Sequence, residues 1–147
     1  MNWQEAQKYS PLVLRWGLSF VFVWFGLNQI FSPAAFMGYL PTWAVQDQAG
    51  MEHMLYSMAS AVPGGARGIL LINGIVELIL GTLLAMGLCT RVAALLLSLH
   101  LLGIVLSLGY NDIAIRDVGL VLATFSIFLA GRDRWCWDYW RKNGSIK

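Results

Sequence analysis

Charged side chains are scarce in this sequence of 147 residues, at 12%, whereas soluble domains have about 25%. The formal net charge of +2 is too small to indicate a nucleic-acid partner. Only two cysteines occur, Cys89 and Cys136, which excludes a disulfide scaffold and a four-cysteine metal site. Nucleotide-binding, zinc-protease and serine-nucleophile motifs are also missing. These absences argue against a nucleic-acid-binding protein, an ordinary cytosolic enzyme and a metal centre.

Hydrophobic residues, in contrast, make up 58% of the chain, and the mean hydropathy is +0.62. They gather in four long runs, residues 11–31, 69–88, 92–108 and 113–130. Each run is long enough to cross a hydrocarbon core of about 30 Å as a helix. The sequence supplies no polar layer that would cover so much apolar surface in water. We therefore predict an all-α membrane protein, with residues 1–147 as one domain and four transmembrane helices packed as a bundle.

The orientation in the membrane follows from the basic residues near the ends of the runs, because cytoplasmic loops carry more of them. On the other side of the predicted membrane, only Arg67 flanks a run. The tail adds tryptophan and tyrosine, which collect at membrane surfaces. We expect an inner (plasma) membrane protein with both termini in the cytoplasm. The seven basic residues on that side are Lys8, Arg91, Arg132, Arg134, Arg141, Lys142 and Lys147.

The outer loop, residues 32–68, is too long for a simple connection between paired helices, which is about 2–8 residues. Ser32 as an N-cap and Pro33 after it predict a short helix that Pro41 ends. A second helix is predicted before the Pro63-Gly64-Gly65 stop, lying on the outer surface or folding over the bundle as a lid. Its apolar residues recur at helical spacing: Met51, Met54, Leu55, Met58 and Val62.

Polar side chains inside the runs are the candidate functional residues, since charge in a bilayer is costly. At about 1.5 Å per residue, Glu77 and His100 both lie near mid-membrane. Asn73 lies one turn from Glu77 on the same helix face. We predict that all four helices contribute to one cluster, in which Glu77 pairs with Arg116 directly or through Asn73 or a water. The cluster comprises Asn28, Gln29, Asn73, Glu77, His100, Arg116 and Asp117.

Two interpretations of this cluster stay open. It can bind a polar head group such as a quinone or relay protons, or it can only hold the helices together. In the first case, the candidate catalytic residues are Glu77, His100, Arg116 and Asp117. The candidate quinone-binding residues are Asn28, Gln29, Asn73, Glu77, His100 and Arg116.

Arg15 stands apart from this cluster, about one turn inside the cytoplasmic end of the first run. We interpret it as an anchor whose stem is buried and whose charged head reaches the membrane surface. For His100, no second histidine lies in another run at matching depth, which argues against a bis-histidine haem. The cysteines lack a C-x-x-C pairing, which argues against thiol redox chemistry.

Short motifs in the runs and between them carry a family resemblance. Leu14-Arg15 and Trp24-Phe25-Gly26-Leu27 are followed by Asn73-Gly74-Ile75-Val76-Glu77-Leu78 with Gly81 and Gly87. Thr90-Arg91 and Asn111-Asp112-Ile113-Ala114-Ile115-Arg116-Asp117-Val118-Gly119 complete the set. From Pro11 to Gly131, the chain resembles the DoxX family of small four-span bacterial and archaeal membrane proteins. The resemblance implies a four-helix bundle related to small subunits of thiosulfate:quinone oxidoreductases, and it assigns no catalytic residues.

Three functions stay open on these observations. The leading hypothesis is an integral membrane subunit of a redox complex, a quinone-linked oxidoreductase in which the cluster contacts the quinone pool or a proton path. The second is a cofactor-free accessory subunit that anchors or assembles a larger membrane complex. The third is a small-solute carrier. In the first two, the partners are the lipid bilayer and other protein subunits.

The predicted topology can be tested by labelling a cysteine introduced into the outer loop, residues 32–68. Because seven basic residues flank the opposite ends of the runs, a membrane-impermeant reagent should label this cysteine on intact cells. Labelling only after the cells are permeabilised would reverse the assignment.

Overall fold

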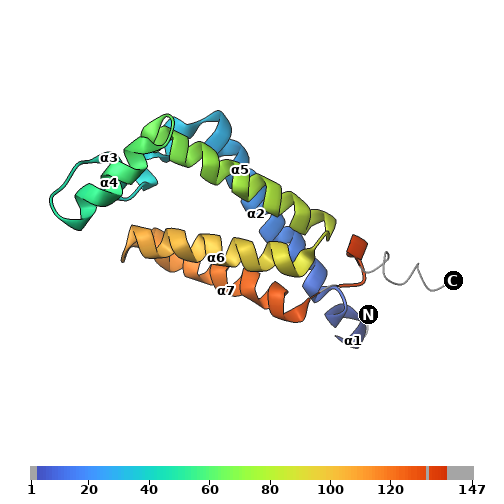
Figure 1. Ribbon diagram of the computed structural model, residues 1–147. Helices are drawn as coiled ribbons and strands as arrows, with labels where there is room; N and C mark the ends of the chain where they lie inside the picture. Colours follow the sequence, from blue (N-terminus) through green and yellow to red (C-terminus); the bar gives the residue numbers. More distant parts are fainter. Residues whose placement is uncertain (1–2, 132, 139–147) are drawn as a thin grey trace. The chain divides into compact units, whose positions relative to one another are not determined.

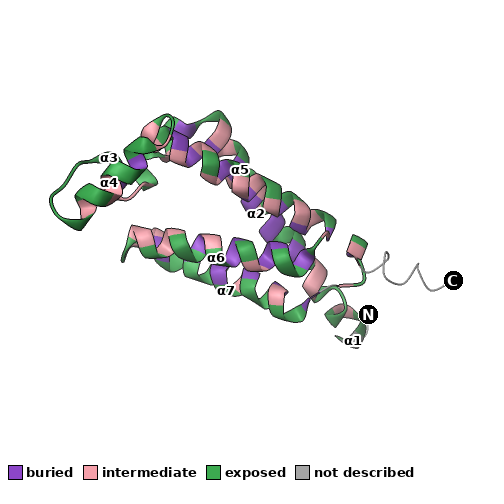
Figure 2. Ribbon diagram, in the orientation of Figure 1, coloured by how far each residue is buried: buried purple, intermediate pink, exposed green. Residues whose placement is uncertain are grey.

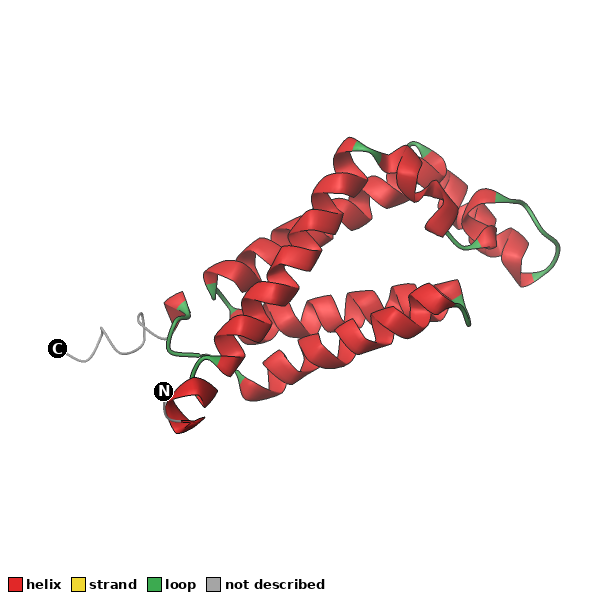
Figure 3. Cartoon of the chain, turned by 180° about the vertical axis from the view of Figure 1, so that it is seen from behind, coloured by secondary structure: helices red, strands yellow, loops and turns green. Residues whose placement is uncertain are grey.

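The computed structural model describes residues 3–131 and 133–138, and within these ranges the chain is helical with no strand (Figure 3). Its four long helices are α2 (Ser10–Phe31), α5 (Gly65–Met86), α6 (Thr90–Leu108) and α7 (Asp112–Ala130) (Figure 1). All four are long and apolar enough to span a membrane. The predicted all-α membrane fold is confirmed.

The ends of these helices agree closely with the predicted runs. α2, α6 and α7 each begin one or two residues before the run and end with it. α5 differs most, because it starts directly at the Pro63-Gly64-Gly65 stop rather than at residue 69. It ends at Met86 because Gly87 takes a left-handed conformation, with φ of 69°. The amides of Gly87 and Leu88 then bond back to Leu84 and Leu83.

The remaining helices are short: α1 (Trp3–Gln7), η1 (Pro33–Tyr39), α3 (Thr42–Val45) and α4 (Met51–Ala61). The predicted methionine-bearing helix of the outer loop is confirmed as α4. The piece that begins at Pro33 is a 3₁₀ helix. The expectation that Ser32 caps it is wrong, since its side chain makes no cap hydrogen bond. With ψ at 54°, Ser32 lies outside the extended conformation that a capping serine adopts.

The chain divides into two compact units, and both α2 and α5 contribute to each. The first consists of Met1–Val23 and Ile79–Lys147, and the second of Trp24–Leu78. In the first unit, α6 packs along α7, and Ser98 donates a hydrogen bond to the Val121 carbonyl across that contact. Figure 2 shows buried residues along all four long helices. The apolar core of the first unit comprises Leu18, Phe22, Leu84, Ala93, Ala94, Leu97, Leu101, Val121 and Ile127.

In the second unit, α2 and α5 meet backbone to backbone at two glycines. A Cβ atom added to Gly26 would lie 2.7 Å from the Gly74 carbonyl oxygen and 2.8 Å from the Leu78 amide nitrogen. One added to Gly74 would lie 2.9 Å from the Gly26 carbonyl oxygen. Small residues at helix contacts are typical of membrane proteins, because apolar side chains gain little by leaving lipid. The two glycines therefore set the approach of α2 to α5.

The outward faces of the long helices are apolar and exposed. Phe20 and Leu106, for example, expose 69% and 74% of their surface. A soluble monomer rarely leaves so much contiguous apolar surface to water. These faces are suited to lipid.

The glycine contact predicts a position-specific effect of one added methyl group. Gly26→Ala should lower thermal stability in detergent by about 1–3 kcal/mol, because the two backbones must separate. Gly103→Ala in α6 is the matched control, since no heavy atom lies within 4 Å of the Cβ it would add. Equal melting temperatures for the two variants would show that the Gly26–Gly74 contact is not close in the protein.

Candidate functional site

Three polar side chains of the second unit form a ring of hydrogen bonds, here called the Glu77 cluster: the buried Gln29 and Glu77 and the half-buried Asn73. Gln29 Nε2 donates to Glu77 Oε2 at 3.0 Å. Asn73 Nδ2 donates to Glu77 Oε1 at 3.2 Å and to Gln29 Oε1 at 2.7 Å. Glu77 and Gln29 are 4% and 5% exposed. Each member bonds to the other two, so both carboxylate oxygens are held in place within a transmembrane segment.

The glycine contact explains why these three residues can meet. Asn73 and Glu77 flank Gly74 on α5, and Gln29 follows Gly26 by one turn on α2. The Gln29 Cβ lies only 3.0 Å from where a Cβ of residue 74 would be. A larger residue there would displace Gln29 from the carboxylate. The prediction that Asn73 lies one turn from Glu77 on the same helix face is confirmed by the hydrogen bond between them.

Asn28 precedes Gln29 in sequence, but its side chain bonds to its own helix. Its Nδ2 donates to the Trp24 carbonyl, one turn back in α2, at 2.7 Å. Successive residues of a helix point in different directions, about 100° apart at 3.6 residues per turn. Asn28 therefore takes no part in the described hydrogen bonds of the Glu77 cluster, and its predicted role in binding a quinone stays a prediction.

The other predicted site residues belong to the first unit. Arg116 pairs with its neighbour Asp117 in α7, with Nη2 and Oδ1 2.9 Å apart. The Asp117 side chain is 9% exposed and that of Arg116 58%. His100, in α6, has a buried Nε2 atom with no hydrogen-bond partner in the part of the chain that the structure describes. That these residues join the Glu77 cluster, and that Glu77 pairs with Arg116, stay predictions.

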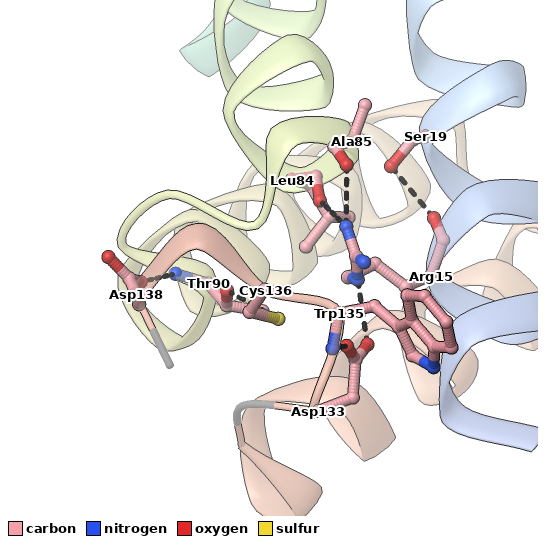
Figure 4. A network of polar contacts seen from close by, with 9 residues as sticks. All are labelled: Arg15, Ser19, Leu84, Ala85, Thr90, Asp133, Trp135, Cys136 and Asp138. Atoms are coloured by element: carbon pink, nitrogen blue, oxygen red, sulfur yellow. Dashed lines mark hydrogen bonds and ion pairs between the residues drawn. The ribbon is translucent and has the colours of Figure 1, made fainter. Parts of the chain in front are cut away.

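Arg15 is the centre of a second polar network, in the first unit (Figure 4). Its Nε donates to Asp133 Oδ2 at 2.8 Å, and its Nη1 donates to the carbonyls of Leu84 and Ala85 in the last turn of α5. Carbonyls of a last helical turn lack partners within the helix. Arg15 is 1% exposed. The interpretation of Arg15 as an anchor reaching the membrane surface is therefore wrong, because Asp133 and α5 bind its head inside the protein.

The segment after α7 forms hydrogen bonds with the turn that connects α5 to α6 and with the first residue of α6. Asp138 accepts a hydrogen bond from the Thr90 amide at the start of α6, and its own amide donates to the Gly87 carbonyl. Cys136 is fully buried against Gly87 and lies 3.4 Å from the Thr90 hydroxyl. Burial raises the pKa of the Cys136 thiol above its usual value. The thiol therefore stays protonated near neutral pH, which suits packing rather than nucleophilic chemistry.

Sequence reasoning missed the Arg15–Asp133 pair, although a signal was present. The predicted topology puts the start of the first run and the end of the fourth on the same side of the membrane. An arginine one turn inside one end and an aspartate just beyond the other are then candidates for a pair.

A double-mutant cycle tests this buried pair. Arg15→Gln and Asp133→Asn should each destabilise the protein by about 3–5 kcal/mol, since the remaining partner is left buried without its counter-charge. The double variant should lose less than the sum, as measured by thermal unfolding in detergent. Arg67→Gln, at an exposed position of the second unit, is the control and should change stability little. Additive losses would show that Arg15 and Asp133 do not interact.

Comparison with known proteins identifies the family. The DoxX family model matches residues 10–109, which include α2, α5, α6, the Glu77 cluster and His100. The Arg116-Asp117 stretch lies beyond the matched residues. No curated protein and no solved structure matches the chain. With two thirds of its length matched and four helices able to span a membrane, the chain belongs to the DoxX family and is a multi-pass membrane protein.

Proposed function

We propose that this protein is an inner-membrane subunit of a redox complex, and that it contacts the quinone pool or a proton path through the Glu77 cluster and His100. One observation carries the proposal: a buried carboxylate is fixed by two carboxamides inside a transmembrane segment. Ionisable residues within membranes are costly and mark ion, proton or substrate pathways. Both termini lie in the cytoplasm under this proposal, as the basic residues indicate.

The chemistry of these side chains fits a quinone head group. Reduction of a quinone to a quinol takes two electrons and two protons, and quinone carbonyl oxygens accept hydrogen bonds. Glu77 can hold or release a proton, while Gln29 and Asn73 keep its oxygens in position. The buried Nε2 of His100 can donate to a carbonyl oxygen or accept from a hydroxyl. The electrons come from a partner subunit in this proposal, since the sequence carries no thiol pair or metal motif of its own.

A second function, a cofactor-free accessory subunit, is favoured by a different observation. In the Glu77 cluster, the three side chains already bond to one another. In the Arg15 network, the described contacts join helix ends. Such networks can serve the packing of helices alone and leave catalysis to partners.

Quinone retained by the purified protein distinguishes the two functions. Glu77→Gln and His100→Gln keep hydrogen-bonding side chains of similar length but remove the titratable groups. Under the redox proposal, each variant should fold and yet bind quinone about tenfold more weakly, which corresponds to about 1.4 kcal/mol. The measurement is quinone content by mass spectrometry after mild detergent extraction, together with titration of a quinone analogue.

Asn28→Ala is the matched control, because the Asn28 amide bonds to its own helix. It should retain quinone as the wild type does. Wild-type quinone binding in folded Glu77→Gln and His100→Gln variants would reject the redox proposal and leave the accessory function.

A further inference from the structure

A groove opens in the first unit where α2 begins and α7 ends. Its volume is about 220 Å³. Whole small-molecule ligands take sites of about 300–1,000 Å³, and a water takes about 30 Å³. The groove is therefore suited to an elongated apolar segment rather than to a complete ligand. Its apolar walls are Pro11, Leu14, Ile127 and Ala130, and Ser10 and Asp133 are among its polar lining residues.

One cation lies against a residue that lines this groove, and two others are near the groove in sequence. The Arg91 guanidinium lies against Gly131, where an added Cβ would be 2.6 Å from Nε of Arg91. Gly131 itself lines the groove. Lys8 comes two residues before Ser10, and Arg134 directly follows Asp133. All three basic residues are exposed.

In this part of the unit, the described basic residues outnumber the carboxylates by one: Lys8, Arg15, Arg91 and Arg134 against Glu5, Asp133 and Asp138. Asp133 is paired with Arg15. Asp138 accepts from the Thr90 amide, at the positive end of the α6 dipole. Glu5, on α1, is the remaining carboxylate of the described residues in this part of the unit. The net charge of this part of the unit therefore favours an anion.

Aromatic residues directly follow two of these basic residues in sequence: Tyr9 follows Lys8, and Trp135 follows Arg134. Tyr9 stacks on Trp135, with ring centroids 6.4 Å apart and planes inclined by 28°. Trp135 and Trp137 are 58% and 66% exposed. Tyrosine and tryptophan occupy the headgroup level of a membrane, with the ring in the apolar region and the polar atom in water. Exposed rings of this kind favour a headgroup-level position for this end of the first unit.

We propose that this groove binds one anionic phospholipid, with an acyl chain between α2 and α7 and the phosphate against Lys8, Arg91 and Arg134. A neutral quinone would leave the cations unused, and a free phosphate would leave the apolar walls empty. Clusters of basic residues at the ends of membrane helices bind anionic headgroups in this way. The inference is independent of the redox proposal, because it uses none of the same residues.

The test uses the full-length protein, stripped of lipid in a neutral detergent. Dioleoyl phosphatidylglycerol and dioleoyl phosphatidylcholine have the same acyl chains and differ in headgroup charge. Native mass spectrometry should show at least tenfold preference for phosphatidylglycerol in the wild type, and that lipid should raise the melting temperature. In the variant carrying Lys8→Gln, Arg91→Gln and Arg134→Gln, the preference should fall to near one. Arg67→Gln, which also removes one exposed cation, should keep it.

A substitution that blocks the groove tests the contribution of the acyl chain separately from that of the cations. Ala130→Phe places a ring in the groove and should abolish retention of the lipid while leaving the three cations in place. Should the triple variant not fold, the single Arg134→Gln variant is expected to lose at least threefold in preference. Equal retention of the two lipids, or unchanged retention in Ala130→Phe, would overturn the proposal. So would equal stabilisation by glycerol phosphate, or by a quinone analogue, in place of phosphatidylglycerol.

Discussion

A polar side chain in a bilayer has no water to bond, so a partner within the protein or at the membrane surface stabilises it strongly. This constraint organises both polar networks. Gln29, Asn73 and Glu77 satisfy one another in a closed ring. Arg15 finds Asp133 and the last carbonyls of α5. In both networks, polar groups from separate helices or segments are joined, so the bonds that satisfy a buried group also connect parts of the chain distant in sequence.

Close packing makes the first ring possible. Gly26 and Gly74 let the backbones of α2 and α5 touch, and the side chains one turn away then reach each other. In the first unit, Gly87 also allows a close backbone contact, because a Cβ there would lie 2.6 Å from the Cα of Cys136. The segment that carries Asp133, Cys136 and Asp138 can therefore lie against the end of α5.

The sequence predicts the long helices of this fold well, because the length of an apolar run can be compared directly with the thickness of a bilayer. The same holds for Asn73 and Glu77, which one helical turn places together. Prediction from the sequence fails where a contact depends on the direction in which a side chain points. Asn28 and Gln29 are adjacent, yet one bonds to its own helix and the other to the carboxylate. Arg15 and Asp133 are 118 residues apart, so no local pattern connects them.

The two networks suit different roles. The Arg15 network joins helix ends through an ion pair in which Arg15 also bonds to two carbonyls of α5, which suits a structural role. The Glu77 cluster holds a proton-accepting group within a transmembrane segment, and His100 presents a buried nitrogen. A membrane protein that only packs helices does not need a titratable carboxylate there, since a third carboxamide would make similar bonds at a lower cost of burial.

Infrared difference spectroscopy of the purified protein in lipid, recorded as bound quinone is reduced, tests the redox role of Glu77 most directly. If Glu77 takes up or releases a proton with the quinone, the spectrum should contain a carboxyl C=O band that is absent from Glu77→Gln. The control variant Asn28→Ala should keep that band. Identical spectra from the wild type and Glu77→Gln would contradict the account and show that the carboxylate serves only to hold α2 and α5 together.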